Sequence, residues 1–250
     1  EVLAMLGIGD HDMVGTTHYL YLFERLKDAK ELAPMLVQMP IGGGQKVSKI
    51  GAPVSVMVSW DDPEKIRGDD EVRHQFFVHS VSHHIHNDVK VYTFWLFKSY
   101  GWVYEGLAYL QETRQFGSPL VNCSQETGGT ANWKGKCWET NVRKALIAGE
   151  APPFQQVISK GADQLSDMER QFSWSYIDYL MWEDPNKMPQ LLALMKGSQL
   201  PTRDCLEQAY GLSIGQFIDN WTAFVRREYA SKPYKGPKKR TPKVPPHPGD

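Results

Sequence analysis

Two histidines four positions apart constrain the fold of this 250-residue chain more than any other feature. They are His79 and His83, and they lie in the stretch from Asp70 to about Asn87, where apolar residues recur at helical intervals. On a helix, side chains at this spacing project from one face, one turn apart. Two imidazoles placed in this way can bind one metal ion. A third ligand must then come from a second element that packs against this helix.

The next predicted helix offers such a ligand. It runs from Gly101 to Leu110, begins 18 residues after His83 (101 minus 83) and contains Glu105. Two histidines and one carboxylate leave a fourth tetrahedral position open to water, as catalytic zinc sites require. We therefore predict a zinc site formed by His79, His83 and Glu105.

Nearby polar residues leave alternatives open. His86 shares the face of the histidine pair and is an alternative third ligand, although three ligands on one helix strain a tetrahedral site. Asp88 is either a partner that orients a histidine or a solvated acid. The cluster also has a metal-free interpretation, in which Glu105 is a buried acid paired with a histidine.

These motifs resemble those of the gluzincin metallopeptidases, and among them the peptidase MA-like domains. Members carry H-E-x-x-H on one helix, followed by a W-x-x-E-G-x-A element whose glutamate is the third ligand. The corresponding segments here are His79-Ser80-Val81-Ser82-His83 and Trp102-Val103-Tyr104-Glu105-Gly106-Leu107-Ala108. The resemblance covers roughly residues 76 to 229, and it implies a zincin-like fold that binds zinc through these three ligands.

The first motif departs from the family at Ser80. Members have a glutamate there, which accepts a proton from zinc-bound water, whereas a serine hydroxyl is not a base near neutral pH. General-base help is worth about 10²- to 10⁴-fold in rate. The resemblance therefore implies a degenerate peptidase with impaired or absent activity, acting in binding or scaffolding. The alternative is an active zinc peptidase that uses Glu112 or Asp88 as its base.

A second departure concerns the residue that stabilises the oxyanion. Many relatives have a tyrosine in the helix that follows the metal site, and the alignment places Phe172 there. Tyr176 is our candidate for this role, and Tyr179 is the alternative.

The rest of the sequence predicts an α+β fold of the zincin type, with a small sheet-and-helix N-terminal lobe followed by a mostly helical C-terminal lobe. Strands are expected over 16–22 and 54–60, with a helix over 23–38 between them. Further helices are expected over 138–148, 153–158, 168–182, 188–194, 203–210 and 213–229, the last with a capping box at Ser213 and Gln216. We expect one metallopeptidase-like domain over 1–230, with the α/β lobe and the metal-site helices in 1–116 and the helical lobe in 137–230. Residues 231–250 form a tail rich in proline and lysine.

Composition argues against two classes of partner. The chain has 28 Lys+Arg against 29 Asp+Glu and a net charge of -1, which provides no global field for nucleic acid. No run approaches the roughly 18 apolar residues that a membrane span needs. Three cysteines are too few for a disulfide scaffold, although Cys123 and Cys137 could pair in an oxidising compartment.

We expect a peptide or protein partner in the cleft between the lobes, and an exported or cell-envelope location. A metal-free module that binds a partner protein through this cleft or the basic tail is the remaining alternative. The sequence does not indicate an oligomeric state.

Overall fold

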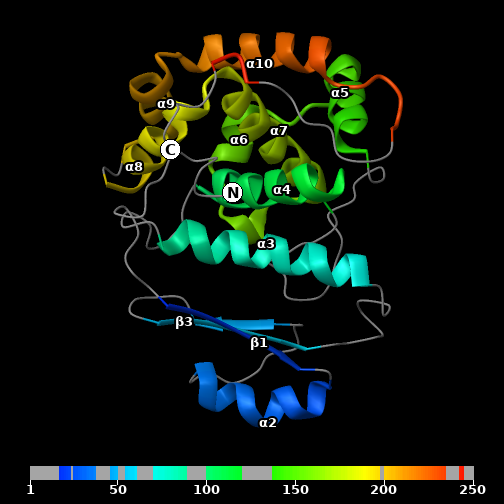
Figure 1. Ribbon diagram of the computed structural model, residues 1–250. Coiled ribbons are helices and arrows are strands. Elements are labelled where there is room, and N and C mark those ends of the chain that lie inside the picture. The colour runs from blue at the N-terminus through cyan, green and yellow to red at the C-terminus, as the bar shows by residue number, and fades with distance from the viewer. Residues whose placement is uncertain are drawn as a thin grey trace.

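Helices make up most of the described chain, and a small sheet lies at one end (Figure 1). The computed structural model describes residues 17–23, 25–37, 46–49, 54–60, 70–88, 100–119, 137–197, 200–234 and 242–244. Among these, the helical predominance expected of the C-terminal part is confirmed. The finer zincin-like class stays a prediction.

Three strands form the sheet, in the order β1-β3-β2. They are β1 (Thr17–Phe23), β2 (Lys46–Lys49) and β3 (Val54–Trp60). β1 and β3 are parallel, so the chain must cross over between them, and helix α2 (Leu26–Val37) lies within this connection. β2 pairs antiparallel with β3 and was not predicted from the sequence.

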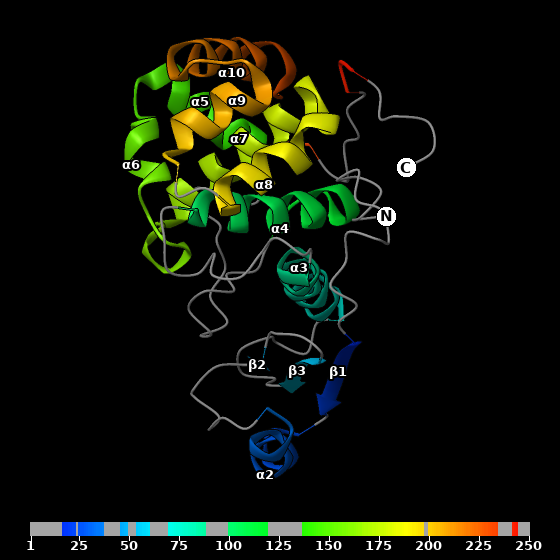
Figure 2. The same cartoon turned by 90° about the vertical axis from the view of Figure 1, so that its left-hand side faces the viewer.

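Helix α2 covers one face of the sheet. Its residues Ala29, Ala33 and Val37 recur every four positions and are buried together with Val56 of β3. On the other side of the sheet lies α3 (Asp70–Asp88), as both views show (Figures 1 and 2). α3 therefore lies between the sheet and the helical lobe.

Helix α4 (Gly101–Phe116) is buried along most of its length. It contacts α3 on one side and α7 (Asp167–Glu183) on the other (Figure 2). The helix extends beyond its predicted end at Leu110 and stops at Gly117, which has φ 84° and donates its N–H to the Thr113 carbonyl. This left-handed conformation is one that glycine adopts without steric cost.

The helical lobe surrounds α7. Its other helices are α5 (Trp138–Ala148), α6 (Phe154–Ile158), α8 (Met188–Gly197), α9 (Thr202–Tyr210) and α10 (Ile214–Glu228), with the short 3-10 helices η3 (Ala162–Gln164) and η4 (Pro185–Lys187). The capping box predicted at Ser213 and Gln216 is confirmed at the start of α10. Among the described residues, one large cluster of buried apolar side chains extends from α4 to α10, and a second cluster lies between α2 and the sheet.

A buried polar network secures the end of α10 against α7. The Tyr229 hydroxyl lies 2.9 Å from Ser175 Oγ and 3.1 Å from Asp178 Oδ2, and Trp221 Nε1 donates to the same Ser175 oxygen at 2.9 Å. Because these groups are buried, their mutual hydrogen bonds replace those that water would otherwise make. Among the described helices, none is both long and apolar enough to cross a membrane.

Candidate metal centre

Helices α3 and α4 bring the three predicted metal ligands together. His79 Nε2 lies 3.0 Å from His83 Nε2. Glu105 Oε2 is 3.8 Å from His79 Nε2, and Glu105 Oε1 is 3.7 Å from His83 Nε2. One donor atom of each residue lies within 4.8 Å of the others, so the three side chains converge as the spacing predicted.

The donor set fits a metal ion. Bonds of about 2.0–2.1 Å at tetrahedral angles would separate the donors of a zinc ion by about 3.3 Å. The observed separations of 3.0, 3.7 and 3.8 Å bracket that value. The exposed fractions of His79, His83 and Glu105 are 0%, 2% and 0%, so the donors face each other rather than solvent. A buried group of this composition could hold a metal ion.

Glu112 fixes the orientation of His79. Its Oε1 lies 2.5 Å from His79 Nδ1, and both side chains are fully buried. This contact favours the tautomer with the proton on Nδ1, which leaves the Nε2 lone pair for the cluster. Glu112, weighed above as an alternative base, therefore lies at the edge of the ring opposite Nε2, where it orients the imidazole.

Two tyrosines of α4 hold the imidazole rings. The Tyr104 ring is stacked on that of His83, with centroids 3.8 Å apart and an interplanar angle of 11°. The Tyr109 ring centroid is 4.8 Å from that of His79. Burial, followed by the charge of Glu105, raises the pKa of Tyr109 well above its ordinary value, so its hydroxyl stays protonated.

Arg170 of α7 adds a buried positive charge. Its Nη1 lies 3.5 Å from Glu105 Oε2, and its side chain is fully buried. Burial lowers the pKa of Arg170, but the electrostatic influence of Tyr109 and Glu105 outweighs this and raises it above its ordinary value. The guanidinium is therefore charged, as arginine is in proteins generally.

Gly106 explains how α7 comes so close to the cluster. A Cβ at this position would lie 2.7 Å from the Ser173 carbonyl oxygen and 2.7 Å from Ile177 Cγ1. The absence of a side chain therefore lets the α7 backbone lie against α4, one residue after Glu105. This contact gives a physical role to the glycine of the W-x-x-E-G-x-A element.

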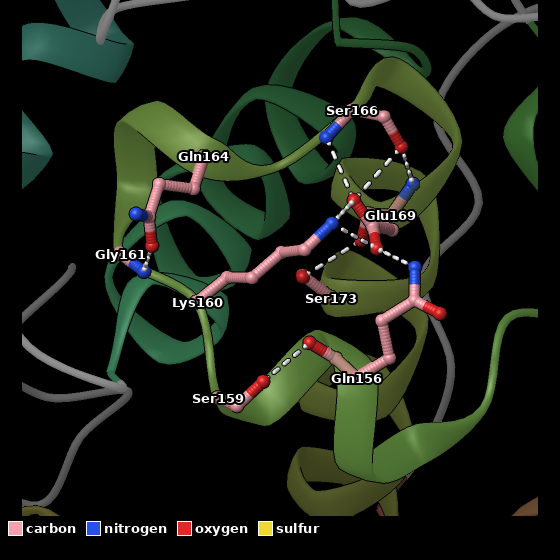
Figure 3. Close-up of polar contacts among 8 residues, drawn as sticks. All are labelled: Gln156, Ser159, Lys160, Gly161, Gln164, Ser166, Glu169 and Ser173. Carbon is pink, nitrogen blue, oxygen red and sulfur yellow. Dashed lines mark hydrogen bonds and ion pairs between the residues drawn. The ribbon is translucent and has the colours of Figure 1, made fainter.

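Hydrogen bonds to Glu169 anchor the first turn of α7, the turn that carries Arg170 (Figure 3). The Glu169 carboxylate accepts hydrogen bonds from Lys160 Nζ at 2.6 and 2.8 Å and from Gln156 Nε2 at 2.7 Å. It also accepts the Ser166 N–H at 2.9 Å, completing a capping box. Burial raises the pKa of Glu169, but these hydrogen bonds outweigh it and lower the pKa below its ordinary value.

The structure also describes the serine at the general-base position and the aromatic candidates of α7. Ser80 follows His79 on α3 and is fully buried. The Tyr176 ring contacts aromatic residues of the helical core, among them Phe154 and Trp221 with centroids 4.9 Å away in both cases. Phe172 and Tyr179 also pack in this core.

Among the described residues, Tyr104 and Tyr109 are the tyrosines whose ring contacts with the histidine pair are seen. Tyr109 and Glu112 follow Glu105 by four and seven positions, a helical signal in the sequence that could have identified both. Arg170 has no such signal, because its proximity depends on how α7 packs against α4.

The side chains of His86 and Asp88, and the whole of Cys123, lie outside the described residues. The alternative ligand and the Asp88 base therefore stay predictions. The pairing of Cys137 with Cys123 is wrong, because Cys137 has a free thiol, which lies 3.2 Å from Thr140 Oγ1. No protein-family model, curated protein or solved structure matches this chain, so the gluzincin resemblance rests on its motif residues alone.

Proposed function

We propose that this chain is a degenerate, gluzincin-like domain of the α+β zincin type that binds zinc through His79, His83 and Glu105. It would act by binding or scaffolding rather than by efficient peptide hydrolysis. The observation that supports this proposal is the convergence of three buried donors, with a serine at the position of the general base. The proposed partner is a peptide or protein bound between the lobes.

The residues around the centre can hold a metal ion in place, but none of those described is positioned to act as a general base. A bound zinc ion would supply Lewis-acid chemistry and activate water. Among the described carboxylates at the cluster, Glu105 is a ligand and Glu112 contacts His79 Nδ1. The Ser80 hydroxyl does not accept a proton near neutral pH. We therefore expect hydrolysis to be slow even with zinc in place.

A metal-free binding module is the second candidate, and one observation favours it. The two imidazole Nε2 atoms are close enough for a direct hydrogen bond, at 3.0 Å. This hydrogen bond, together with the guanidinium of Arg170 beside Glu105, would hold the cluster together without a metal ion. The two candidate functions differ in whether the chain binds added zinc.

Zinc titration of the chelator-treated chain separates them. We expect the wild-type chain to bind one zinc ion, and His79→Ala and Glu105→Gln to lose this binding. His74→Ala is the matched control, because His74 is an exposed histidine on the same helix. A wild-type chain that does not bind zinc, or a His79→Ala variant that binds it equally well, would rule out the proposed centre.

Peptide cleavage tests the second half of the proposal. We expect the zinc-loaded wild-type chain to cleave unstructured peptides no faster than His79→Ala does. Ser80→Glu returns a carboxylate to the base position, and a gain of about 10²-fold or more is expected if the missing base alone limits the rate. Efficient cleavage by the wild-type chain, lost on His79→Ala, would show instead that another group serves as the base.

A further inference from the structure

We propose that the guanidinium of Arg170 takes the place of the metal's charge in the metal-free chain, and thereby limits how tightly the centre binds a divalent ion. This inference rests on the proposed zinc site. It concerns a residue of the helical lobe that lies outside the ligand set.

Arg170 and a metal ion would share one carboxylate. Glu105 Oε2 lies 3.5 Å from Arg170 Nη1 and 3.8 Å from His79 Nε2. Glu105 Oε1 faces His83 Nε2 at 3.7 Å. A cation between the imidazoles would therefore lie on the same carboxylate as the guanidinium, in a region closed to solvent. The bound cation and the Arg170 guanidinium would repel each other strongly, because both contact one carboxylate and no water screens their charges.

The charges around the cluster support the same conclusion. The described groups that contact one another at the cluster come from three helices. They are His79 and His83 from α3, Glu105, Tyr109 and Glu112 from α4, and Arg170 from α7, on which Asp167 of the same helix also acts electrostatically. With neutral imidazoles and a neutral phenol, two carboxylates and one guanidinium sum to -1. A divalent ion would change that sum to +1. Without Arg170 the sums would be -2 and 0, so the guanidinium favours the metal-free state.

A purely structural role for Arg170 predicts the opposite result. If the guanidinium served only to hold Glu105 in place, its removal would disorder a ligand and weaken zinc binding. If its charge competes with the metal, removal strengthens zinc binding and destabilises the metal-free chain, in which Glu105 loses its contact with the guanidinium. The sign of the change in zinc affinity therefore distinguishes the two roles.

The experiment measures zinc Kd by competition with a chromophoric chelator, and thermal midpoints with and without zinc. Arg170→Met and Arg170→Gln remove the charge, whereas Arg170→Lys retains it. Arg203→Met is the matched control, because the Arg203 side chain is 70% exposed and pairs with Asp204. We expect zinc to bind at least about tenfold more tightly to the two uncharged variants, and with near wild-type affinity to Arg170→Lys and Arg203→Met. Zinc should also raise the midpoints of the uncharged variants more than that of the wild type.

Failure of this inference can be told apart from failure of the zinc site. A folded wild-type chain that does not bind zinc removes both. If the wild type binds zinc and His79→Ala does not, but Arg170→Met and Arg170→Gln bind no more tightly than wild type, only the role of Arg170 is wrong. Variants that fold only with zinc support the role. Uncharged variants that fail to fold even with zinc overturn it, because the metal should then supply the missing charge.

Discussion

Replacing Gly106 with alanine tests the contact on which the geometry of the centre depends. The added methyl group would meet the Ser173 carbonyl oxygen at 2.7 Å and Ile177 Cγ1 at 2.7 Å. The isoleucine side chain can rotate away, but the carbonyl belongs to the α7 backbone. Relief of the contact with the Ser173 carbonyl therefore requires α7 to move as a unit. This movement would displace Arg170 from Glu105.

Two opposing terms set the size of the effect. Alanine in place of glycine inside a helix is favourable by about 1 kcal/mol. Overpacking of a close contact costs about 1–3 kcal/mol, and a rigid backbone neighbour places Gly106 at the upper end. The net destabilisation of Gly106→Ala is then about 2 kcal/mol.

Gly215→Ala is the matched control, because Gly215 lies in α10 and a Cβ there would meet nothing within 4 Å. This variant should gain up to about 1 kcal/mol. The two variants should thus differ by about 3 kcal/mol, or about 6–12 °C in thermal midpoint for a chain of this size. Calorimetric or circular-dichroism melting measures the difference. Equal midpoints for Gly106→Ala and the wild type would refute the claim that α7 contacts α4 through this glycine.

Three further substitutions test individual contacts. Glu112→Gln should weaken zinc binding by about 10- to 100-fold, because an amide orients the His79 ring less well than a carboxylate does. Glu207→Gln is the control, because Glu207 is exposed, and it should leave zinc affinity unchanged. Chelator competition measures both affinities, and equal values would contradict the orienting role of Glu112. Glu169→Gln should remove a stabilisation that the wild type has above pH 4.5, the ordinary pKa of Glu169, and loses as the pH falls through its lowered value. Denaturant titrations of the two chains should therefore converge in acid, and a constant difference would exclude this ionisation as the source. Tyr229→Phe should cost about 1–3 kcal/mol because the buried contacts of its hydroxyl with Ser175 and Asp178 are lost. An unchanged midpoint in urea would show that the network contributes little.

Local signals in the sequence were sufficient to predict that the three donor residues converge, and to predict most of the described helices. The spacing of His79 and His83 depends only on helical geometry, and the element around Glu105 specified the second helix. Helix α5 has the predicted bounds, and the cap at Ser213 lies where its side-chain chemistry placed it. These features depend on residues close together in the chain.

Features that depend on packing were missed. Tyr104 and Tyr109, whose rings contact the histidine pair, were not singled out, whereas the role given to Tyr176 stays a prediction. Arg170 contacts Glu105 across 65 positions of sequence (170 minus 105), and only the approach of α7 to α4 brings the two together. Strand β2 was missed because the stretch Lys46–Lys49 is short and comes soon after three glycines, so its sequence pattern alone does not predict a strand. Its antiparallel hydrogen bonds to β3 stabilise it instead.

The two separate apolar clusters imply unequal stability along the chain. Among the residues whose burial is described, the cluster between α2 and the sheet consists of Ala29, Ala33, Val37 and Val56, whereas the helical core extends from α4 to α10. On the buried apolar residues that the structure describes, we expect the lobe with the sheet to open at a lower free energy than the helical core. Amide protons of β3 should therefore exchange with solvent before those of α7. A zinc ion bound by residues of both α3 and α4 would reduce this difference in exchange rate, because it would link the helix next to the sheet to the slowly exchanging helical core.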